Sequence, residues 1–338
     1  MKISAFASHE PKSLLKSFSY EAAELGPQDA EIAISHCGIC HSDIHLIDND
    51  WGRSKYPFVP GHEIVGSVVS IGGGVSHLKV GQRVGIGWQR SSCLKCEHCL
   101  EGNENLCAAQ EAICVGHHGG FSDRIRTDSR FVFPLPDGLS SASTAPLLCG
   151  GATVFAPIRR FGVSKKSRVG VIGIGGLGHM ALIFLKAFGC EVTAFSSSES
   201  KREETLRLGA HHFVSSTNPR EVMTKANQFD LLLSTVNARL DWVTYLQTVK
   251  PNGVLCLVGA PPGLLQISPG QLVSAQKMVC GSDIANRATI VEMLQFADRH
   301  HISPQIETAP MSEVNQGIER LRKNQVRYRM VMENSPSE

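Results

Sequence analysis

The sequence lacks the features of a membrane-spanning or secreted chain. None of its 338 residues belong to an uninterrupted apolar run approaching the roughly 18 residues that a transmembrane helix needs. The N-terminal segment MKISAFASHEPKSLLKSFSY contains no apolar core of the kind found in secretory signals. We therefore expect no membrane partner and a cytoplasmic location.

A basic run or stripe is also absent. Lysine and arginine number 33 against 31 acidic residues, which gives a formal net charge of +2. Nothing in this balance indicates a nucleic acid partner. The hydrophobic content of 42% is that of a globular protein, and the length exceeds one ordinary core, so we expect two domains.

The pattern of predicted elements changes along the chain. Residues 1–150 contain short alternating runs broken by glycine and proline, such as Asp29–Ser35, Ile64–Ile71 and Arg83–Ile86. Strands at this spacing favour a compact, mostly antiparallel domain.

After that region, predicted strands alternate with predicted helices, which is typical of a doubly wound parallel sheet. The predicted strands are Arg168–Ile172, Glu191–Phe195, His212–Ser215, Phe229–Thr235 and Gly253–Val258. The predicted helices between them are His179–Phe188, Lys201–Leu208 and Asp241–Val249. The tail predicts helices at Ala288–His300 and Met311–Lys323 and a strand at Val326–Met332. The fold class is therefore α/β, with the doubly wound unit inserted into a domain built from both chain ends.

Four of the eleven cysteines crowd into one polar segment, with the spacing Cys93-x2-Cys96-x2-Cys99-x7-Cys107. In a cytosolic chain of this size, such crowding favours metal binding over a disulfide framework. Four thiolates complete a tetrahedral zinc ion and leave it no open position, which predicts a structural site. An iron–sulfur cluster also uses four cysteines and is the alternative.

A second set of candidate ligands is Cys40, His62 and Cys149. Two thiolates and one imidazole leave a zinc ion one position for water or substrate, so the ion can polarise a carbonyl group. Glu63 would orient this site or become a metal ligand itself. Asp43 would hold His62 in place without binding the metal. Taken alone, Cys149 fits a small buried hydrophobic residue equally well, so the combination carries the prediction.

The remaining cysteines have simpler interpretations. Cys37 forms a C-x-x-C pair with Cys40, a pattern also found in redox sites. We favour Cys40 as the ligand because polar residues follow it directly, and we assign Cys37 to packing. We expect the others in the core: Cys114, Cys190, Cys256 and Cys280.

A glycine-rich turn, Gly173-Ile-Gly175-Gly176-Leu-Gly178, lies between a predicted strand and a predicted helix. Glycines there allow a tight turn and let a pyrophosphate approach backbone N–H groups at the helix N-terminus. This context predicts a dinucleotide site, and a glycine-rich loop without a ligand is the alternative.

The end of the next strand distinguishes NADP from NAD. NAD enzymes place Asp or Glu there to bind the ribose 2′-hydroxyl. Here the strand runs into Ser196-Ser197-Ser198, followed by Lys201 and Arg202. Small hydroxyls and a cation suit a 2′-phosphate, provided that Glu199 points away. A serine-rich loop without this role is the alternative.

Together these segments resemble the medium-chain, zinc-dependent alcohol dehydrogenases, and within them the cinnamyl-alcohol-dehydrogenase branch. The resemblance covers nearly the whole chain. Its most specific residues, besides the cysteine lobe, are Cys37–His45, Gly61–Glu63, Leu148–Gly151 with Thr153, and Gly173–Gly178. Segments such as IDNDWG, VGQRVGIGW and RVGVIGIGGLGH are particularly similar to bacterial NADPH-dependent aldehyde reductases of broad specificity.

The resemblance implies a GroES-like catalytic domain at residues 1–150 and 286–338 and a Rossmann NADP-binding domain at residues 151–285. It also implies two zinc ions per subunit and a homodimer. Ser42 and His45 would relay a proton through the cofactor ribose, and Trp51 and Trp88 would line the substrate pocket. For His45 a solvent-facing loop position is the alternative, and for the two tryptophans a structural place in the core.

The resemblance further implies the contacts to NADP(H), with His41 and Arg327 at the pyrophosphate and Thr153 at the nicotinamide. The full set is His41, Thr153, Gly173, Gly175, Gly176, Leu177, Gly178, Ser196, Ser197, Ser198, Lys201, Thr235, Gly259, Ser282, Ile284 and Arg327. One segment departs from the branch, since Gly281-Ser-Asp-Ile-Ala285 replaces a common Gly-Ser-x-x-Gly pattern near the nicotinamide.

The sequence therefore predicts an enzyme, an NADP-dependent alcohol dehydrogenase working as an aldehyde reductase. Its substrates would be primary alcohols and aldehydes, aliphatic or aromatic. One alternative is an NAD-dependent polyol or secondary-alcohol dehydrogenase, against which the serine-rich loop argues. Another is a zinc-stabilised NADPH-binding protein without turnover, which would have no use for an open metal position.

Overall fold

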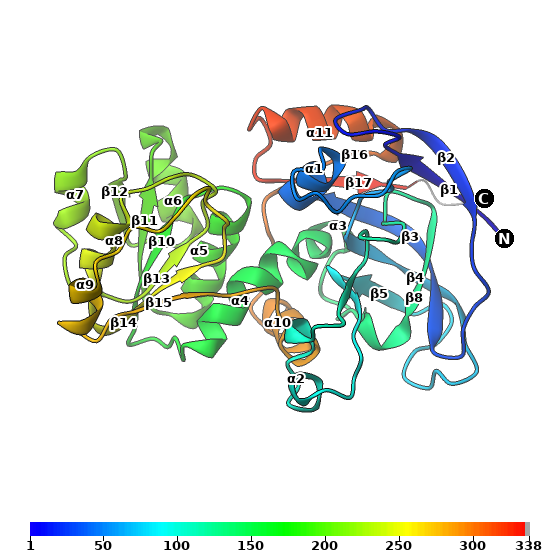
Figure 1. Ribbon diagram of the computed structural model, residues 1–338, viewed down its shortest axis with the longest axis horizontal. Coiled ribbons are helices and arrows are strands. Elements are labelled where there is room, and N and C mark those ends of the chain that lie inside the picture. The colour runs from blue at the N-terminus through cyan, green and yellow to red at the C-terminus, as the bar shows by residue number, and fades with distance from the viewer. Residues whose placement is uncertain (335–338) are drawn as a thin grey trace. The chain divides into compact units, whose positions relative to one another are not determined.

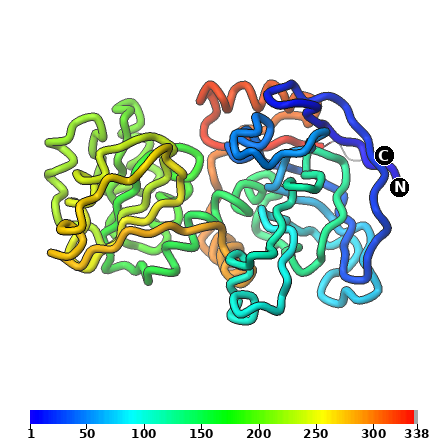
Figure 2. Tube along the Cα trace, viewed as in Figure 1, coloured from blue at the N-terminus to red at the C-terminus, as the bar shows by residue number. Residues whose placement is uncertain are grey.

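The computed structural model describes residues 1–334, which divide into two compact units (Figure 1). The first unit comprises Met1–Cys149 and the chain from Ala285 onward, and the second comprises Gly150–Ile284. The Cα trace shows that the N-terminal and C-terminal segments belong to the same unit (Figure 2). The first unit is thus built from both ends of the chain.

A seven-stranded sheet organises the first unit, with the order β16-β17-β3-β4-β5-β9 and with β8 also paired to β3. The β16–β17 pair is parallel and the other pairs are antiparallel. The strands are β3 (Asp29–Ile39), β4 (Glu63–Ile71), β5 (Arg83–Ile86), β8 (Arg124–Asp128), β9 (Val132–Pro134), β16 (Ile306–Pro310) and β17 (Arg329–Glu333). Two antiparallel pairs lie outside this sheet: β1 (Lys2–Ala7) with β2 (Lys16–Glu21), and β6 (Gln89–Ser91) with β7 (Glu111–Ala112).

Strand β3 is central because β4, β8 and β17 all pair with it. Its β-branched residues Ile32 and Ile39 are buried in the core of the unit, together with Cys37. The burial of Cys37 fits its predicted packing role. The strand ends at Ile39, so the residues that follow begin at one edge of a rigid sheet.

Short helices cover parts of this sheet. In α11, Val314, Ile318 and Leu321 are buried, and their spacing places them on one face of the helix. The helices of the unit are α1 (His41–Ile47), α2 (Glu97–Leu100), α3 (Ser141–Thr144), α10 (Arg287–Arg299) and α11 (Val314–Arg322).

The second unit is a six-stranded parallel sheet with the order β12-β11-β10-β13-β14-β15. Numbered along the chain, this is the order 3-2-1-4-5-6 of the doubly wound dinucleotide-binding fold. The strands are β10 (Arg168–Ile172), β11 (Glu191–Ser196), β12 (His212–Ser215), β13 (Phe229–Ser234), β14 (Val249–Leu257) and β15 (Met278–Gly281). The helices are α4 (Gly150–Arg160), α5 (Gly176–Phe188), α6 (Arg202–Leu208), α7 (Pro219–Met223), α8 (Trp242–Thr248) and α9 (Pro269–Val273). The predicted α/β fold class is confirmed.

Most differences from the predicted elements are at their ends. The C-terminal strand begins at Arg329 and not at Val326, because its pairing with β16 starts at Arg329 and its pairing with β3 starts at Met330. Strand β14 begins at Val249, four residues earlier than predicted, with a register irregularity against β13.

Two predicted helices begin with a tighter turn. A 3-10 helix at Glu199–Lys201 precedes α6, and another at Met311–Glu313 precedes α11. Such turns are common at helix N-termini, where the first N–H groups have no partner within the helix.

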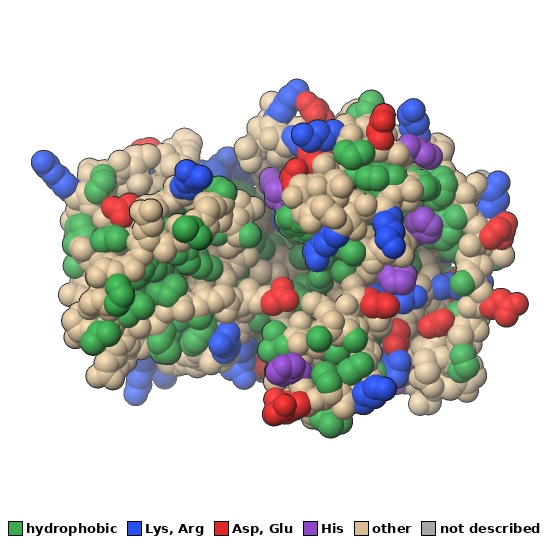
Figure 3. Space-filling model, in the orientation of Figure 1, with side chains coloured by type: hydrophobic (Ala, Val, Ile, Leu, Met, Phe, Trp, Pro, Cys, Tyr) green, Lys and Arg blue, Asp and Glu red, His purple; other side chains and the backbone are tan. Residues whose placement is uncertain are grey.

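Among residues 1–334 no single helix is long and apolar enough to cross a membrane; only the bent pair of Ser141–Leu148 and Gly150–Arg160 has such a length and composition. On the face drawn in Figure 3, acidic and basic side chains are interspersed and form no continuous basic stripe.

The turn between β10 and α5 depends on a close backbone approach. A Cβ atom on Gly178 would lie 1.9 Å from the carbonyl oxygen of Gly173, so no larger residue fits without moving the turn. Gly175 is different, because a Cβ atom there would meet no protein atom within 4 Å.

We expect Gly178→Ala to destabilise the protein by about 1–3 kcal/mol, because the new methyl group collides with backbone. The measurement is the midpoint of chemical denaturation, followed by circular dichroism. Gly175→Ala is the matched control and should leave the midpoint close to that of the unmodified protein. Equal midpoints for the two variants would contradict this account of the turn.

Candidate functional site

Cys40 stands where β3 ends and α1 begins. Its backbone N–H donates to Oδ2 of Asp43 at 2.9 Å, the reciprocal bond of a capping arrangement. An acidic residue in the first turn also suits the positive end of the helix. Asp43 thereby fixes the position of Cys40 on the helix.

The other oxygen of Asp43 holds the second predicted ligand. Asp43 Oδ1 accepts the N–H of Gly61 at 2.9 Å and lies 3.0 Å from Nδ1 of His62. Both side chains are completely buried. An ionised carboxylate only accepts hydrogen bonds, so Nδ1 of His62 carries a proton, and Nε2 is the nitrogen whose lone pair a metal ion would take in place of a proton. The predicted contact between Asp43 and His62 is present.

Gly61 makes this arrangement possible. Its φ of +99° lies in the left-handed region, and a Cβ atom would come within 3 Å of Phe121 and of Cys37 Sγ. A residue with a side chain would therefore move the N–H group that binds Asp43, and with it His62.

The ligand atoms of Cys40, His62, Glu63 and Cys149 all lie within 4.8 Å of one another. Cys149 follows a 3-10 helix at Ala145–Leu148, and its Sγ is 3.3 Å from Nε2 of His62. The fold therefore brings three separate chain segments to one point. Two thiols and one imidazole nitrogen are a donor set that zinc takes in catalytic sites.

A hydrogen bond between the two thiols of the cluster shifts their pKa values in opposite directions. The hydrogen bond with Cys149, together with His62 and Arg329, outweighs burial and holds the pKa of Cys40 well below its ordinary value. The same hydrogen bond, with burial, raises the pKa of Cys149 well above its ordinary value. Although burial opposes it, the charge of Asp43 raises the pKa of His62 well above its usual range. Such mutual dependence is expected where several ligands lie close together around a metal position.

Glu63 is the first residue of β4 and forms a buried ion pair with Arg329, the first residue of β17. Burial raises the pKa of Glu63 to about 7, against the attraction of Arg329. Its second oxygen, Oε2, is buried and has no hydrogen-bond partner among residues 1–334. A buried carboxylate that lies among three other ligands and has an oxygen without a hydrogen-bond partner fits contact with a metal ion.

Two residues near this cluster were not predicted. No local pattern marks Arg329, which reaches Glu63 only through sheet pairing across the chain. Cys114 is buried as expected, but it also lies within 4.8 Å of the ligand atoms of Asp43 and His62. Its place beside the cluster has no signal in the sequence.

The four cysteines of the lobe also converge. Sγ of Cys93 is 3.9 Å from that of Cys99 and 3.5 Å from that of Cys107. Four sulfurs at about 2.3 Å from one tetrahedral ion are separated by about 3.8 Å, so the spacing fits zinc. Backbone N–H groups of Lys95 and Cys96 hold the pKa of Cys93 at about 6, which favours the thiolate that a metal needs.

The lobe is attached to its unit by buried polar contacts. Glu104, almost fully buried, accepts from Arg287 Nε at 2.8 Å, and its carbonyl accepts from Gln89 Nε2 at 2.8 Å. No catalytic chemistry is required of a site that uses all four protein ligands.

The predicted relay residues lie on α1. Ser42 and His45 are both partly exposed and three residues apart, so they share one face of the helix. His45 Nδ1 lies 2.8 Å from Oδ2 of Asp50, and its ring packs 5.3 Å from the Trp51 ring. Trp88 packs edge-on against His62, with the ring centroids 5.0 Å apart.

In the second unit, the glycine turn has the features of a phosphate cradle. Gly173 adopts φ +86°, and the hydroxyl of Thr235 donates to its carbonyl at 2.7 Å. A Cβ atom on Gly175, at the start of α5, would meet no protein atom within 4 Å, so the backbone there is open to a ligand. Lys201 Nζ donates to the carbonyl of Ile174 at 2.6 Å, which places its ammonium group at the turn.

Ser196 ends β11 and is buried, and its hydroxyl accepts the N–H of Ser198 at 3.2 Å. Glu199 pairs with Arg202, so its carboxylate is directed to a neighbouring cation as NADP binding would require. The same pair engages Arg202, which leaves Lys201 as the cation at the turn.

The other predicted cofactor contacts are dispersed over both units. Gly259 donates to the carbonyl of Ser234, and Gly176 and Leu177 open α5. Thr153 is on α4, Ser197 is exposed, Ser282 is partly exposed, and Ile284 is buried. His41 and Arg327 belong to the first unit and are exposed, and their contact with a pyrophosphate stays a prediction.

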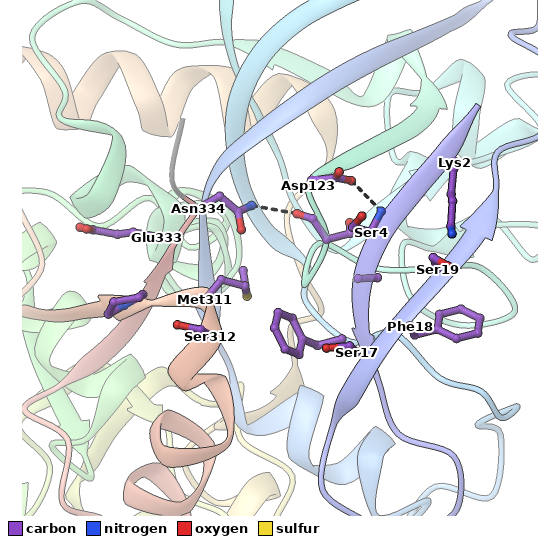
Figure 4. A pocket seen from close by; sticks show the side chains of 14 residues that line it. Lys2, Ser4, Ser17, Phe18, Ser19, Asp123, Met311, Ser312, Glu333 and Asn334 are labelled. Carbon is purple, nitrogen blue, oxygen red and sulfur yellow. Dashed lines mark hydrogen bonds between the residues drawn. The ribbon is translucent and has the colours of Figure 1, made fainter. Parts of the chain in front are cut away.

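A separate hollow of about 590 Å³ lies beside the β1–β2 hairpin (Figure 4). Two hydrogen bonds join residues that line this hollow: the side-chain amide of Asn334 donates to the carbonyl of Ser122, and the N–H of Ser4 donates to Asp123. It contains none of the predicted site residues, so the candidate site is the buried cluster around His62.

Comparison with known proteins identifies both units. The family described as alcohol dehydrogenase GroES-like domain matches residues 26–137, and the zinc-binding dehydrogenase family matches residues 176–299. The chain is 45% identical to an aldehyde reductase, AdhA, of Synechocystis over 98% of this chain and 99% of that protein.

Solved structures agree with this result. A cinnamyl alcohol dehydrogenase of Sorghum bicolor is 38% identical and superposes with a TM-score of 0.95, covering 100% of both chains. A cinnamyl alcohol dehydrogenase of Helicobacter pylori, solved in complex with NADP(H), is 32% identical with a TM-score of 0.91, covering 98% of both chains. This chain therefore belongs to the zinc-dependent, medium-chain alcohol dehydrogenases, in the cinnamyl-alcohol-dehydrogenase branch, and is an oxidoreductase with a GroES-like and a Rossmann-type domain.

Proposed function

We propose that this protein is an NADP-dependent aldehyde reductase that interconverts aldehydes and primary alcohols, aliphatic or aromatic. The observation that carries the proposal is the meeting of Cys40, His62 and Cys149 at one point, with His62 held in one tautomer by Asp43. A zinc ion with three protein ligands keeps a fourth position for a carbonyl oxygen. The similarity to an aldehyde reductase supports the same substrate class.

A bound zinc ion would supply Lewis acidity to the carbonyl oxygen, and NADPH would supply the hydride. The chain's own residues prepare these steps. Cys40, His62 and Cys149 would hold the ion, and Asp43 keeps the lone pair of His62 Nε2 directed at it. Glu63, whose Oε2 has no hydrogen-bond partner among residues 1–334, would be available as a further oxygen ligand for the ion.

Ser42 and His45 are the proposed proton relay. They lie on one face of α1, directly after the ligand Cys40, and His45 is partly exposed to solvent. The contact with Asp50 orients the imidazole ring of His45. A histidine at the solvent boundary can pass a proton inward near neutral pH.

We propose that the lobe of Cys93, Cys96, Cys99 and Cys107 holds a second, structural zinc ion. The sulfur spacing supports this assignment, and the zinc-binding description of the family favours zinc over an iron–sulfur cluster. Zinc at both sites requires reduced thiols, and all eleven cysteines are free. A reducing compartment such as the cytoplasm is the proposed location.

NADP is the proposed cofactor because the end of β11 carries Ser196 where NAD enzymes carry a carboxylate. Gly175 leaves room for the pyrophosphate, and Lys201 stands at the same turn. The relative from Helicobacter pylori was solved with NADP(H). These features favour an NADP enzyme over an NAD-dependent polyol dehydrogenase.

A homodimer is proposed through the second unit. Strand β15 is the edge of its parallel sheet, so its outer N–H and C=O groups have no strand partner within residues 1–334. The exposed apolar side chains of Val273 and Met278 lie in the same segment. A second copy paired along β15 would cover both features.

We expect Cys40→Ala to abolish NADPH oxidation by aldehydes while one zinc ion per chain remains in the cysteine lobe. The reason is that the substitution removes a thiolate from the open site alone. Metal analysis and an absorbance assay measure the two effects. Cys37→Ala, which changes a buried thiol of the core three residues away, should keep both metals and turnover. Full activity of Cys40→Ala would refute the ligand assignment.

We expect Ser196→Asp to lower the ratio of kcat/KM for NADPH to that for NADH by about 10- to 100-fold, because a carboxylate repels a 2′-phosphate and binds a 2′-hydroxyl. Ser200→Asp is the control, since it adds the same charge on an exposed position of the same loop. If Ser196→Asp moved the ratio no further than Ser200→Asp, the basis for proposing NADP would be lost.

A further inference from the structure

Arg53 lies against the aromatic side chains that extend outward from His62. Trp88 packs on His62, and Trp51 packs edge-on against Trp88 with the ring centroids 6.4 Å apart. The guanidinium carbon of Arg53 is 5.0 Å from the ring centroid of Trp51 and 5.8 Å from that of Trp88. One cation is thus held by both tryptophans, a single aromatic ring away from a proposed zinc ligand.

The charge of Arg53 is not used elsewhere in the described chain. Within residues 1–334, Arg53 forms no ion pair and donates no hydrogen bond to another residue, and it contacts only the two tryptophan rings in this way. The nearby carboxylates have other partners, since Asp48 pairs with Arg322 and Asp50 with His45. The N–H groups of the Arg53 guanidinium are therefore available to an anion.

We propose that Arg53 is a specificity-determining residue that favours aldehydes carrying a carboxylate at the end remote from the carbonyl group. This inference rests on the proposed function, because it places the carbonyl at the metal held by His62. A guanidinium presents several donors to a carboxylate in a planar arrangement, which makes it a selective partner for that group.

The position of Arg53 fits this role in both distance and rigidity. The ring centroids of His62 and Trp88 are 5.0 Å apart, and the guanidinium carbon of Arg53 is 5.8 Å from the Trp88 centroid. The distance from the guanidinium carbon to the His62 ring is therefore at most the sum of these two. A substrate with one aromatic ring between its aldehyde and its carboxylate is short enough to lie within this limit. The contacts with Trp51 and Trp88 restrict the otherwise flexible side chain, so less entropy is lost when an anion binds.

Steady-state kinetics with NADPH and two aldehydes of similar shape test the proposal. 4-Carboxybenzaldehyde carries the charge and 4-methylbenzaldehyde lacks it. We expect Arg53→Met to lower kcat/KM for the charged aldehyde about tenfold or more, mainly through a higher KM, because a remote contact is made equally in substrate and transition state. The neutral aldehyde should change little.

Lys55→Met is the matched control, since it removes an equal exposed charge two residues away. It should leave the ratio of the two kcat/KM values at the level of the unmodified enzyme, whereas Arg53→Lys should retain part of the preference. An unchanged ratio in Arg53→Met would overturn the proposal. An equal loss for both aldehydes would also overturn it, because Arg53 would then only brace the tryptophans.

Failure of the proposed function gives a different result. In that case the unmodified enzyme would oxidise NADPH with neither aldehyde, and the inference about Arg53 would fall with it. Reduction of both aldehydes without a preference that depends on Arg53 would leave the proposed function intact and refute the inference alone.

Discussion

The carboxylate of Asp43 is the constraint on which the candidate site depends. It accepts three hydrogen bonds, from the backbone of Cys40, the backbone of Gly61 and the ring of His62. A completely buried carboxylate is costly unless its charge is satisfied in this way. The same contacts that satisfy it therefore fix two proposed zinc ligands from different segments, and they set the tautomer of His62. Local chain geometry, at the helix N-terminus and at the left-handed Gly61, allows all three bonds at once.

A second buried charged group, Glu63, contributes a ligand atom to the same cluster. Glu63 and Arg329 pair across strands at opposite ends of the sequence, and both are enclosed. Loss of one partner from such a pair costs about 3–5 kcal/mol, because the other charge is left buried. The pair therefore ties the C-terminal strand to the site. Both ends of the chain build the unit that holds the proposed zinc ligands, while the proposed cofactor site belongs to the unit folded from the middle segment.

The sequence predicted the features whose residues lie close together along the chain. Strand β10 and the glycine turn have local signals, and so do the crowded cysteines of the lobe, because spacing alone places their ligands together. It did not predict Arg329, Cys114 beside His62, or Arg53 over Trp51 and Trp88, since these contacts join residues through tertiary packing. The start of the C-terminal strand was misplaced for the same reason, because it is set by where the pairing with β16 and β3 begins. Residues of the interrupted first unit are brought together by sheet pairing, which no local pattern encodes.

The central claim is that Asp43 holds the open metal site without contacting the metal. The most direct measurement is the zinc content of Asp43→Asn during dialysis against a chelator, because this change preserves size but weakens the hold on His62. The account predicts that one zinc ion per chain is released 10- to 100-fold more readily, at about the level seen when partners of metal ligands are removed, and that the zinc of the cysteine lobe stays. Release of both ions at the rates of the unmodified enzyme, with turnover unchanged, would contradict it.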